Sequence, residues 1–438
     1  MTTPPTVDVR DEQRRQLPRD ASRPVGVRAF WKGLGPGIVA GAADDDPSGI
    51  ATYSVAGAQY GTTLLWTALF TWPLMIAVQT MCARIGMVTG QGIAGALRSK
   101  FPRPVLVAAA VGLFIANTIN VAADLAGMAD AAELLTGVNS HVWVVVLGVG
   151  IAIATIRLRY AILAAGLKWL ALSLVAYVVT ALYIGPSWSV VAHDTFVPSM
   201  PQGAGAWATL VAILGTTISP YLFFWQASQE VEEEKALGRR RVADRIGAKP
   251  YEITTRRIDI TIGTFFSNAA MFFIILATAL TLHRAGITKL ETSRQVADAL
   301  TPLAGRFASL LYTVGLLGTG ALAIPTLAGS GAYAFAEIFR WRQGMDEPYN
   351  RAPGFYAAFI CSVTIGMGLD FSSVNPVSAL YWTAVINGVL APFLLVGILI
   401  AASDRQLMHG QPSPFLGRLV VGLTAVVMFA AAAGMFVF

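Results

Sequence analysis

Three consecutive aspartates stand inside the first long apolar segment of the chain, in the run Asp-Asp-Asp-Pro-Ser-Gly from Asp44 to Gly49. Pro47 has no backbone N–H and clashes with the preceding turn, so a helix breaks here and carbonyl oxygens lose their partners. Asp46 is held at that gap, and no Lys or Arg follows Lys32 within the segment. Because an ionised carboxylate inside a membrane is unfavourable unless it is paired, we expect Asp46 to bind a cation. The alternative is an aspartate that only caps the following helix.

Asp44 and Asp45 end the half-helix before the break, where the helix dipole disfavours each negative charge by roughly 0.3 to 1 kcal/mol. Successive helical residues point about 100° apart, so the three carboxylates cannot all bind one ion. We expect Asp44 or Asp45 to line a vestibule that attracts hydrated cations, or else to face water at its mouth. Ser48 is grouped with Asp45 among the residues that line the ion path or support its ligands.

A second interruption lies in the sixth apolar segment, where residues 215–221 read Gly-Thr-Thr-Ile-Ser-Pro-Tyr. Unwound backbone in a membrane is tolerated only where protein or a water-filled cavity satisfies it. Breaks at the first and sixth positions have the spacing of a five-plus-five inverted repeat and point to a transporter's central site. We expect the backbone carbonyls of Gly49 and Thr216 to bind the ion beside Asp46. Ser219 would contribute a hydroxyl or a contact through water.

Polar residues line one face of the third apolar segment, at helical spacings of three, four and three: Asn117, Asn120, Asp124 and Gly127. We expect this face to border an ion or proton path, with an interhelical hydrogen-bond seam as the alternative. Asn387 in the tenth segment is a further candidate for the path. An acidic run follows the sixth segment and is predicted to form a solvated helix face: Glu230, Glu232, Glu233 and Glu234.

The composition assigns these motifs to a membrane protein. Of the 438 residues, 55% are hydrophobic and only 13% are charged, against about a quarter charged in soluble domains, and the mean hydropathy is +0.61. The net charge of +6 gathers beside apolar segments, where it orients a membrane protein, so no nucleic acid partner is expected. Cys82 and Cys361 lie in apolar stretches and are expected to be packing residues. Residues 1–33 lack the features of a signal peptide and are predicted to form a flexible cytosolic tail.

Since a helical span needs about 20 apolar residues, residues 34–438 are predicted to form a single transmembrane domain of roughly eleven spans. The spans lie near residues 34–61, 62–84, 105–127, 142–156, 161–184, 206–226, 258–282, 307–328, 355–368, 378–402 and 416–438. Residues 34–184 form the predicted first repeat and residues 206–402 the second. Residues 416–438 form an eleventh helix outside both.

The basic residues test this count of spans, because positively charged loops stay in the cytoplasm. With the N-terminus inside, all of the 31 Lys and Arg fall on the cytoplasmic side except Arg284, Lys289, Arg294 and Arg306. Residues 185–205 carry no basic residue, whereas residues 235–257 carry many. The pattern predicts a multi-pass protein of the cell's inner (plasma) membrane, with its N-terminus in the cytoplasm and its C-terminus outside.

The chain resembles a known transporter family in three stretches of its first segment: Gly-Pro-Gly at 35–37, Asp-Pro-Ser-Gly-Ile-Ala-Thr-Tyr-Ser at 46–54 and Gly-Ala-Gln-Tyr-Gly at 57–61. They are similar to the first helix of the Nramp family of divalent-metal transporters. Leu-Ala-Gly-Ser-Gly at 327–331 is similar as well, and the likeness covers nearly the whole chain from Gly33. The resemblance implies an all-α polytopic membrane protein of the LeuT type (APC superfamily), with discontinuous first and sixth helices.

The departures from the family pattern concern the ion. A typical Nramp protein has Asp-Pro-Gly-Asn in the first helix and Met-Pro-His in the sixth, where this chain has Asp-Pro-Ser-Gly and Ser-Pro-Tyr. The amide ligand therefore becomes Gly49 and the thioether becomes Ser219. Soft sulfur favours transition metals, whereas a roomier oxygen site favours a hard ion that keeps its waters. The substitutions are similar to those of the Nramp-related magnesium transporters, which implies Mg²⁺ as the substrate, with Mn²⁺ as a second ion.

The same resemblance implies weak or absent proton coupling. Asn117 and Gly127 stand where proton-coupled members carry glutamates, and Tyr221 and Gln226 stand where the sixth-helix histidines are. By this likeness Tyr221 and Gln226 are further candidate residues of the path. All four histidines fall in or near loops, so no imidazole titrates at mid-membrane: His141, His193, His283 and His409. Uptake would then follow the membrane potential, worth about 2.3 kcal/mol per charge per 100 mV.

The sequence leaves other functions open. A proton-coupled Mn²⁺ or Fe²⁺ symporter of the same family is the nearest alternative. An intramembrane aspartyl protease would use Asp46 and Asp124 as its catalytic pair, but the paired helix breaks have no role in it. A metal-gated receptor would need a soluble effector domain, and residues 235–257 are too few for one. We expect a transporter and no enzyme, with a divalent metal ion and the lipid bilayer as partners, no cofactor and no obligate protein partner.

Overall fold

The apolar segments fold into helices, several of which begin at a proline. The computed structural model describes residues 41, 43–158, 173–371 and 375–437, and no strand occurs among them. The main helices are α4 (Pro47–Tyr60), α5 (Trp66–Thr89), α7 (Arg103–Thr136), α8 (Ser140–Arg157), α10 (Val175–Ile184), α12 (Ala204–Thr217), α13 (Pro220–Ala236), α14 (Pro250–Thr278), α17 (Ala308–Phe339), α18 (Pro353–Leu369), α19 (Pro376–Ser403) and α20 (Phe415–Val437). Shorter helices are α6 (Ile93–Leu97), α11 (Trp188–Phe196), α15 (Ser293–Asp298) and α16 (Thr301–Ala304), and a π-helical turn, Ala279–His283, follows α14.

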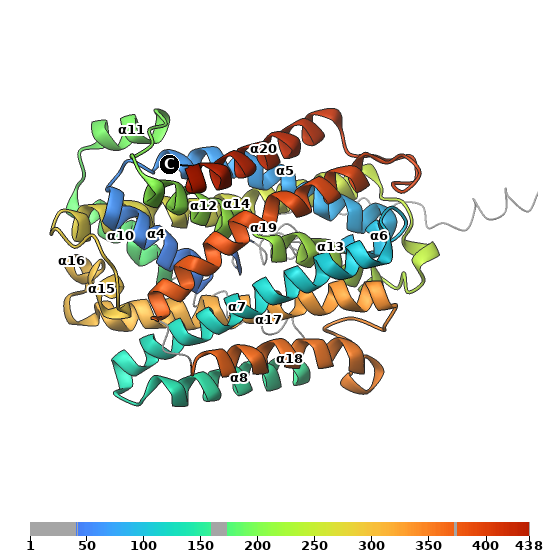
Figure 1. Cartoon of the computed structure of the whole chain (residues 1–438), viewed down its shortest axis with the longest axis horizontal. Helices are drawn as coiled ribbons and strands as arrows, with labels where there is room; N and C mark the ends of the chain where they lie inside the picture. The colour runs from blue at the N-terminus through green and yellow to red at the C-terminus, as the bar shows by residue number, and fades with distance from the viewer. Residues whose placement is uncertain (1–40, 42, 159–172, 372–374, 438) are drawn as a thin grey trace, which may run out of the picture. The chain divides into compact units, whose positions relative to one another are not determined.

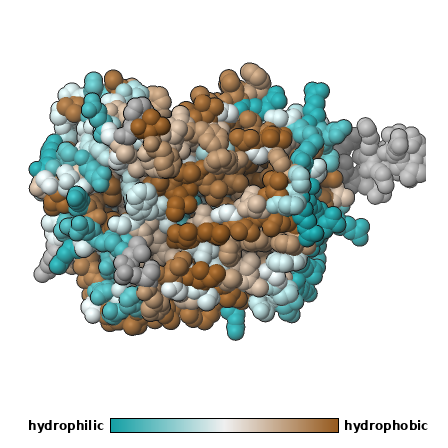
Figure 2. Space-filling view, in the orientation of Figure 1, coloured by the Kyte–Doolittle hydropathy of each residue, from teal (hydrophilic) through white to brown (hydrophobic). Residues whose placement is uncertain are grey.

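Eight helical stretches of the described chain are long and apolar enough to cross a membrane, with α12 and α13 taken as one stretch. The shorter apolar helices α10 and α18 and the broken first helix bring the total to the eleven predicted spans. Apolar residues cover the middle of the molecule, and polar residues gather at two opposite ends (Figure 2). The predicted all-α polytopic fold is confirmed.

Several spans extend further than their sequence limits, among them the third and the eighth. The helix predicted to end near residue 127 runs to Thr136, and the helix predicted to end near residue 328 runs to Phe339. A hydropathy limit marks the edge of the apolar stretch, whereas a helix continues into water as long as its backbone hydrogen bonds are made. Residues 161–172, the first half of the predicted fifth span, lie outside the described residues.

Helices at equivalent positions of the two predicted repeats contact each other. The second span packs on the seventh (α5 on α14), the third on the eighth (α7 on α17) and the fourth on the ninth (α8 on α18). Figure 1 shows α7 beside α17, with α8 and α18 along the same edge. Each broken span packs on the second helix of the other repeat: α4 of the first repeat contacts α14, and α13 of the second repeat contacts α5.

Alternate loops gather at opposite ends of the bundle. At the end near α6, Lys100 forms an ion pair with Asp404, and Gln411 bonds the backbone of Ala248. The Lys100 ammonium and nearby backbone N–H groups hold the pKa of Asp404 below its usual range. At the other end, near α11, α15 and α16 (Figure 1), the Thr62 hydroxyl donates to Asp194 at 2.5 Å. This alternation is what an antiparallel succession of spans requires.

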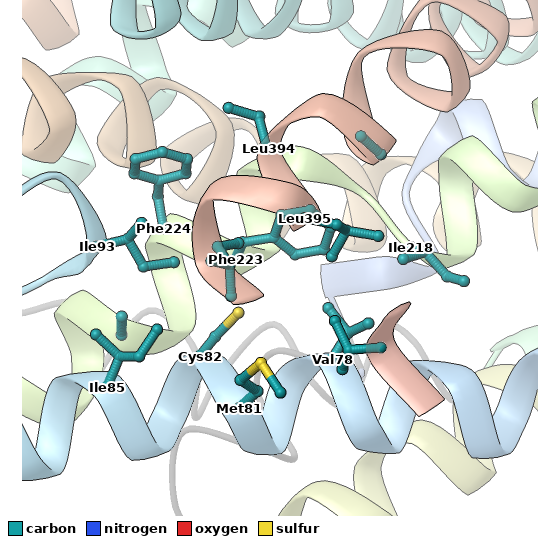
Figure 3. Close-up of a cluster of buried hydrophobic side chains, with 14 of the residues drawn as sticks. Val78, Met81, Cys82, Ile85, Ile93, Ile218, Phe223, Phe224, Leu394 and Leu395 are labelled. Carbon is teal, nitrogen blue, oxygen red and sulfur yellow. The ribbon is translucent and has the colours of Figure 1, made fainter. Parts of the chain in front are cut away.

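A cluster of buried apolar side chains holds the second broken span in place. Ile218, in the break itself, and Phe223, on α13, pack with side chains of α5 and α19 (Figure 3). Cys82 is fully buried in this cluster, as predicted, whereas Cys361 is exposed on α18. Burial of apolar groups on both sides of the break fixes where α13 starts, independently of any ion.

The prediction of a solvated acidic face after the sixth span was wrong for two of its residues. Glu230 and Glu234 are only 2% and 6% exposed, because α13 continues to Ala236 and packs its polar face inward. Arg256 on α14 supplies the counter-charge, with its Nε 2.6 Å from Glu230 and a second ion pair to Glu233. The acidic run therefore belongs to a helix–helix contact, which sequence spacing did not reveal.

Candidate ion-binding site

The first helix breaks at the predicted place, and Asp46 forms the start of its second half. Asp46 is extended (φ −67°, ψ 169°) and caps α4, its Oδ1 accepting hydrogen bonds of 2.7 Å from the Gly49 N–H and the Ser48 hydroxyl. Pro47 occupies the first helical position, where its missing N–H is harmless. The other carboxylate oxygen, Oδ2, accepts a 3.3 Å bond from the Asn120 amide of α7. Asp46 therefore caps α4, as the alternative interpretation predicted. Capping does not neutralise a carboxylate, so it does not exclude a bound cation.

The carbonyl that Pro47 leaves without a helical partner is satisfied by the other broken span. In a continuous helix the residue-47 N–H would bond the Ala43 carbonyl. Instead, the Tyr221 hydroxyl of α13 donates to that oxygen at 2.9 Å. Tyr221, predicted as a residue of the path, therefore connects the two interrupted helices directly.

The second break has the same cause. Thr217 ends α12, Ile218 is non-helical (φ −117°, ψ 56°), and α13 starts at Pro220. Pro220 cannot donate to the Thr216 carbonyl, so the Ser219 hydroxyl does, at 2.7 Å, while also lying 2.7 Å from the Gly215 carbonyl. Ser219 thus satisfies the unwound backbone with its proton, and only the lone pairs of its hydroxyl oxygen are available to an ion or water.

Glycines hold both broken spans against continuous helices. A Cβ built on Gly57 of α4 would lie 2.3 Å from the Ile275 carbonyl of α14, and one on Gly215 of α12 would lie 2.0 Å from the Ala384 carbonyl of α19. Such separations are impossible for any residue with a side chain. The two half-helices are therefore fixed by backbone-to-backbone contact on either side of the breaks.

Three oxygen atoms converge on the space that a side chain at position 49 would fill. A Cβ on Gly49 would lie 3.0 Å from the Thr216 hydroxyl, 3.4 Å from the Asp44 carbonyl and 3.4 Å from Asp46 Oδ1. The Thr216 hydroxyl is buried and has no hydrogen-bond partner among the described residues. These atoms differ from those expected from the sequence, which were the backbone carbonyls of Gly49 and Thr216. The Thr216 hydroxyl and the Asp44 carbonyl face this space instead, and Gly49 leaves it open because it has no side chain.

Three further aspartates surround this point. Asp124, one turn along α7 from Asn120, is fully buried and approaches the Ser48 backbone N–H, but neither of its carboxylate oxygens has a hydrogen bond of normal geometry within the described part of the chain. Asp44 and Asp45 both approach the Ser267 hydroxyl of α14, at 2.6 and 3.1 Å. Ser267 was missed at the sequence level, although Ser267-Asn268 is a polar pair inside an apolar run.

None of these four carboxylates forms an ion pair with a basic residue of the described ranges. Nor do three His, Cys, Asp or Glu side chains of the described chain converge tightly enough to hold a metal ion by themselves. The arrangement therefore suits a cation bound by one carboxylate together with neutral oxygens, and its charge would offset part of the buried negative charge.

The remaining predicted path residues have other contacts. The Asn117 amide donates to the Leu327 carbonyl and the Ser330 hydroxyl of α17, at 2.9 and 2.8 Å, which is the seam that was the alternative. Gln226 donates to Glu230 at 2.7 Å, toward the far end of α13. Asn387 is buried on α19 next to Gly388, and its carbonyl oxygen has no partner among the described residues. Only Asn120 and Asp124 of the third-span face approach the break.

The fold agrees with the comparisons with known proteins. The model of the family described as natural resistance-associated macrophage protein-like matches residues 37–438. The chain belongs to the Nramp family. Members of this family are transporters, so this protein is a multi-pass membrane transporter, and the aspartyl protease alternative was wrong.

Individual relatives align over most of their length. The chain is 29% identical over 403 residues to a protein of Deinococcus radiodurans named divalent metal cation transporter MntH, covering 89% of this chain and 86% of that protein. It is 26% identical over 418 residues to a Bacillus subtilis protein of the same name, covering 92% of each. The manganese transporter of Eremococcus coleocola has a similar fold, with a TM-score of 0.70, 18% identity and coverage of 96% of this chain and 90% of that one. MhsT, solved with L-phenylalanine, is a more distant fold neighbour, with a TM-score of 0.53, 16% identity and coverage of 90% and 98%.

Proposed function

We propose that this Nramp protein transports a divalent metal cation by alternating access, with Mg²⁺ as its main substrate and Mn²⁺ as a second ion. The observation that carries the proposal is Asp46, a buried carboxylate at the break with no basic partner in the described chain. Its Oδ1 shares the space above Gly49 with the Thr216 hydroxyl and the Asp44 carbonyl. The names of the aligned relatives support a divalent metal as the substrate class.

The choice of Mg²⁺ rests on ligand chemistry. The three atoms nearest the open space at Gly49 are oxygens, which hard cations prefer. They can fill about half of an octahedral shell, and Mg²⁺ characteristically keeps several of its waters. Ser219, which stands in place of a thioether ligand, is a hydroxyl whose proton is already given to backbone carbonyls. The set favours a partly hydrated hard ion over a bare transition metal.

Transport is proposed to proceed without strong proton coupling. His141 lies 2.7 Å from Asp370 and His193 lies 3.0 Å from Asp194, both near loops. His283 bonds the Ala58 carbonyl at the outer end of α4, and His409 lies in the connection between α19 and α20. With the N-terminus in the cytoplasm, the basic loops near α6 would face inside and the membrane potential would drive dication uptake.

The competing function is a proton-coupled Mn²⁺ symporter. The similarly folded Eremococcus coleocola protein is a manganese transporter, which supports Mn²⁺ as the ion in this alternative. Flux into proteoliposomes decides between the two. We expect Mg²⁺ uptake driven by an inside-negative potential and unchanged by an inward proton gradient. Mn²⁺ uptake that requires the proton gradient, with no Mg²⁺ uptake or competition, would establish the symporter instead.

Asp46 is tested by two substitutions, because it both caps α4 and carries the charge. Asp46→Asn keeps an oxygen that can accept the Gly49 N–H but removes the charge, and Asp46→Ala removes both. Both variants should lose metal flux, and only Asp46→Ala should also lose about 1 kcal/mol of stability. Asp404→Ala, which removes a half-buried carboxylate paired with Lys100 at the bundle end, serves as the control with normal flux. Normal flux in Asp46→Asn would assign the ion to another site.

A further inference from the structure

Tyr53 presents an unexplained hydroxyl close to the candidate site. It lies on α4 one helical turn after Gly49, and therefore on the same face of the helix. The side chain is 0% exposed, and its hydroxyl has no hydrogen bond of normal geometry within the described chain. A buried phenol usually finds a partner for its O–H.

The Tyr53 hydroxyl has neighbours in common with the proposed ion site. Tyr53 interacts electrostatically with Asp44, Asp45 and Asp46 and lies close to the Thr216 hydroxyl. Thr216 is the residue whose Oγ1 faces the space above Gly49, and its hydroxyl pairs with that of Tyr53, although not at the geometry of a normal hydrogen bond. These two hydroxyls, one from each broken span, have no other hydrogen-bond partner among the described residues and border the space where the carboxylate and the carbonyl converge.

Leaving a hydroxyl buried without a partner costs about 1–3 kcal/mol. Two hydroxyls at a transport site that have only each other as a poorly aligned partner indicate that better partners arrive with the substrate. A bound Mg²⁺ that keeps several waters brings strongly polarised O–H donors and requires acceptors around them. Phenol and threonine hydroxyl oxygens are such acceptors, and they can also donate to the carboxylates.

We propose that the Tyr53 hydroxyl, together with that of Thr216, accepts hydrogen bonds from water molecules retained on the transported ion. Tyr53 is then a positioning residue that makes the site complementary to a partly hydrated cation. The inference rests on the proposed function, since it needs the ion to bind beside Asp46. Tyr53 would then contribute to selectivity, because the binding of an ion that gives up its waters readily depends on Tyr53 less than the binding of Mg²⁺ does.

The test is the concentration dependence of Mg²⁺ and Mn²⁺ flux in proteoliposomes for wild type, Tyr53→Phe and Thr216→Val. Tyr53→Phe removes only the hydroxyl and keeps the ring packing. We expect the KM for Mg²⁺ to rise about tenfold and that for Mn²⁺ by less than about threefold, with the maximal rates within twofold. Thr216→Val removes the second hydroxyl and should change the KM ratio in the same direction.

Tyr177→Phe is the matched control. Tyr177 on α10 is also buried with an unpaired hydroxyl among the described residues, but its neighbour is Tyr312 and not the aspartates. It should leave both KM values unchanged. Equal increases for both ions, unchanged KM values, or a loss confined to the maximal rate in Tyr53→Phe would overturn the role of Tyr53.

Asp46→Asn, measured alongside, separates this inference from the proposed function. If Asp46→Asn loses flux while Tyr53→Phe behaves like wild type, the site stands and only the role of Tyr53 is wrong. If Asp46→Asn transports normally, or if wild type carries no Mg²⁺, the proposed site or substrate is wrong and the inference fails with it.

Discussion

The Tyr221 hydroxyl donates a 2.9 Å hydrogen bond to the Ala43 carbonyl oxygen, the acceptor that Pro47 leaves without a helical donor. One side chain of the sixth span thereby completes the backbone hydrogen bonding of the first. Any movement that separates the two half-helices must break this bond or carry both residues together. The two breaks are therefore coupled through the protein before an ion binds.

Removal of this bond should slow transport. In Tyr221→Phe the Ala43 carbonyl would remain buried without a donor, at a free-energy cost of about 1–3 kcal/mol. We expect a several-fold lower maximal rate and a lower unfolding temperature, with the KM for Mg²⁺ little changed. Tyr356→Phe is the control, because its hydroxyl donates to the Met345 and Glu347 carbonyls far along the chain from the breaks. A Tyr221→Phe variant that matches wild type in rate and stability would contradict the coupling.

Position 49 should control which ion is carried. In Gly49→Asn the new Cβ would approach the Thr216 hydroxyl to 3.0 Å, and the amide oxygen would replace a water of the ion. We expect the Mg²⁺ KM to rise at least tenfold while Mn²⁺ flux persists, measured as a KM ratio in proteoliposomes. Gly49→Ala adds the Cβ without the amide, so it should weaken transport of both ions. An unchanged KM ratio in Gly49→Asn would exclude position 49 as a determinant of selectivity.

Arg256 should be a major source of stability at the contact between α13 and α14. It is paired with the buried Glu230, and removing one partner of a buried ion pair costs about 3–5 kcal/mol. Arg256→Met should therefore lower the unfolding temperature in detergent strongly. Adding Glu230→Gln should recover part of the loss, because the uncompensated charge is then gone.

The neighbouring Arg257→Met is the control for Arg256→Met, since Arg257 is exposed. It should unfold at the wild-type temperature. If Arg257→Met and Arg256→Met destabilise equally, the ion-pair network contributes nothing specific.

The close approach of α12 to α19 should not tolerate a methyl group. Gly215→Ala would bring a Cβ to 2.0 Å from the Ala384 carbonyl and 2.3 Å from the Gly388 nitrogen, both backbone atoms that cannot move aside. We expect a loss of about 1–3 kcal/mol or more in thermal unfolding. Gly150→Ala on α8 has nothing within 4 Å and should be neutral or slightly stabilising. Equal stability of the two variants would argue against the close packing.

Much of the fold was predictable, because membrane spans are set by local composition. Long apolar runs have no stable alternative to a helix in lipid. Both breaks were found at their residues because each proline there stands next to polar residues inside an apolar run. A proline alone was not enough, since Pro73, Pro325 and Pro392 lie inside continuous helices. The helix ends at Thr136 and Phe339 were not found, since hydropathy records the lipid boundary and not the end of backbone hydrogen bonding.

The sequence by itself therefore located an acidic break in the first span and a second break in the sixth, and it predicted a cation between them. Only the tertiary structure decided which atoms meet there. Thr216 contributes its hydroxyl, Asp44 its carbonyl, and Tyr53 and Ser267 join from other turns and helices. These contacts depend on how closely the helices approach and how they are rotated against each other. Glycine contacts and core packing between residues distant in the chain set both, and the spacing of residues along a single span carries no information about them.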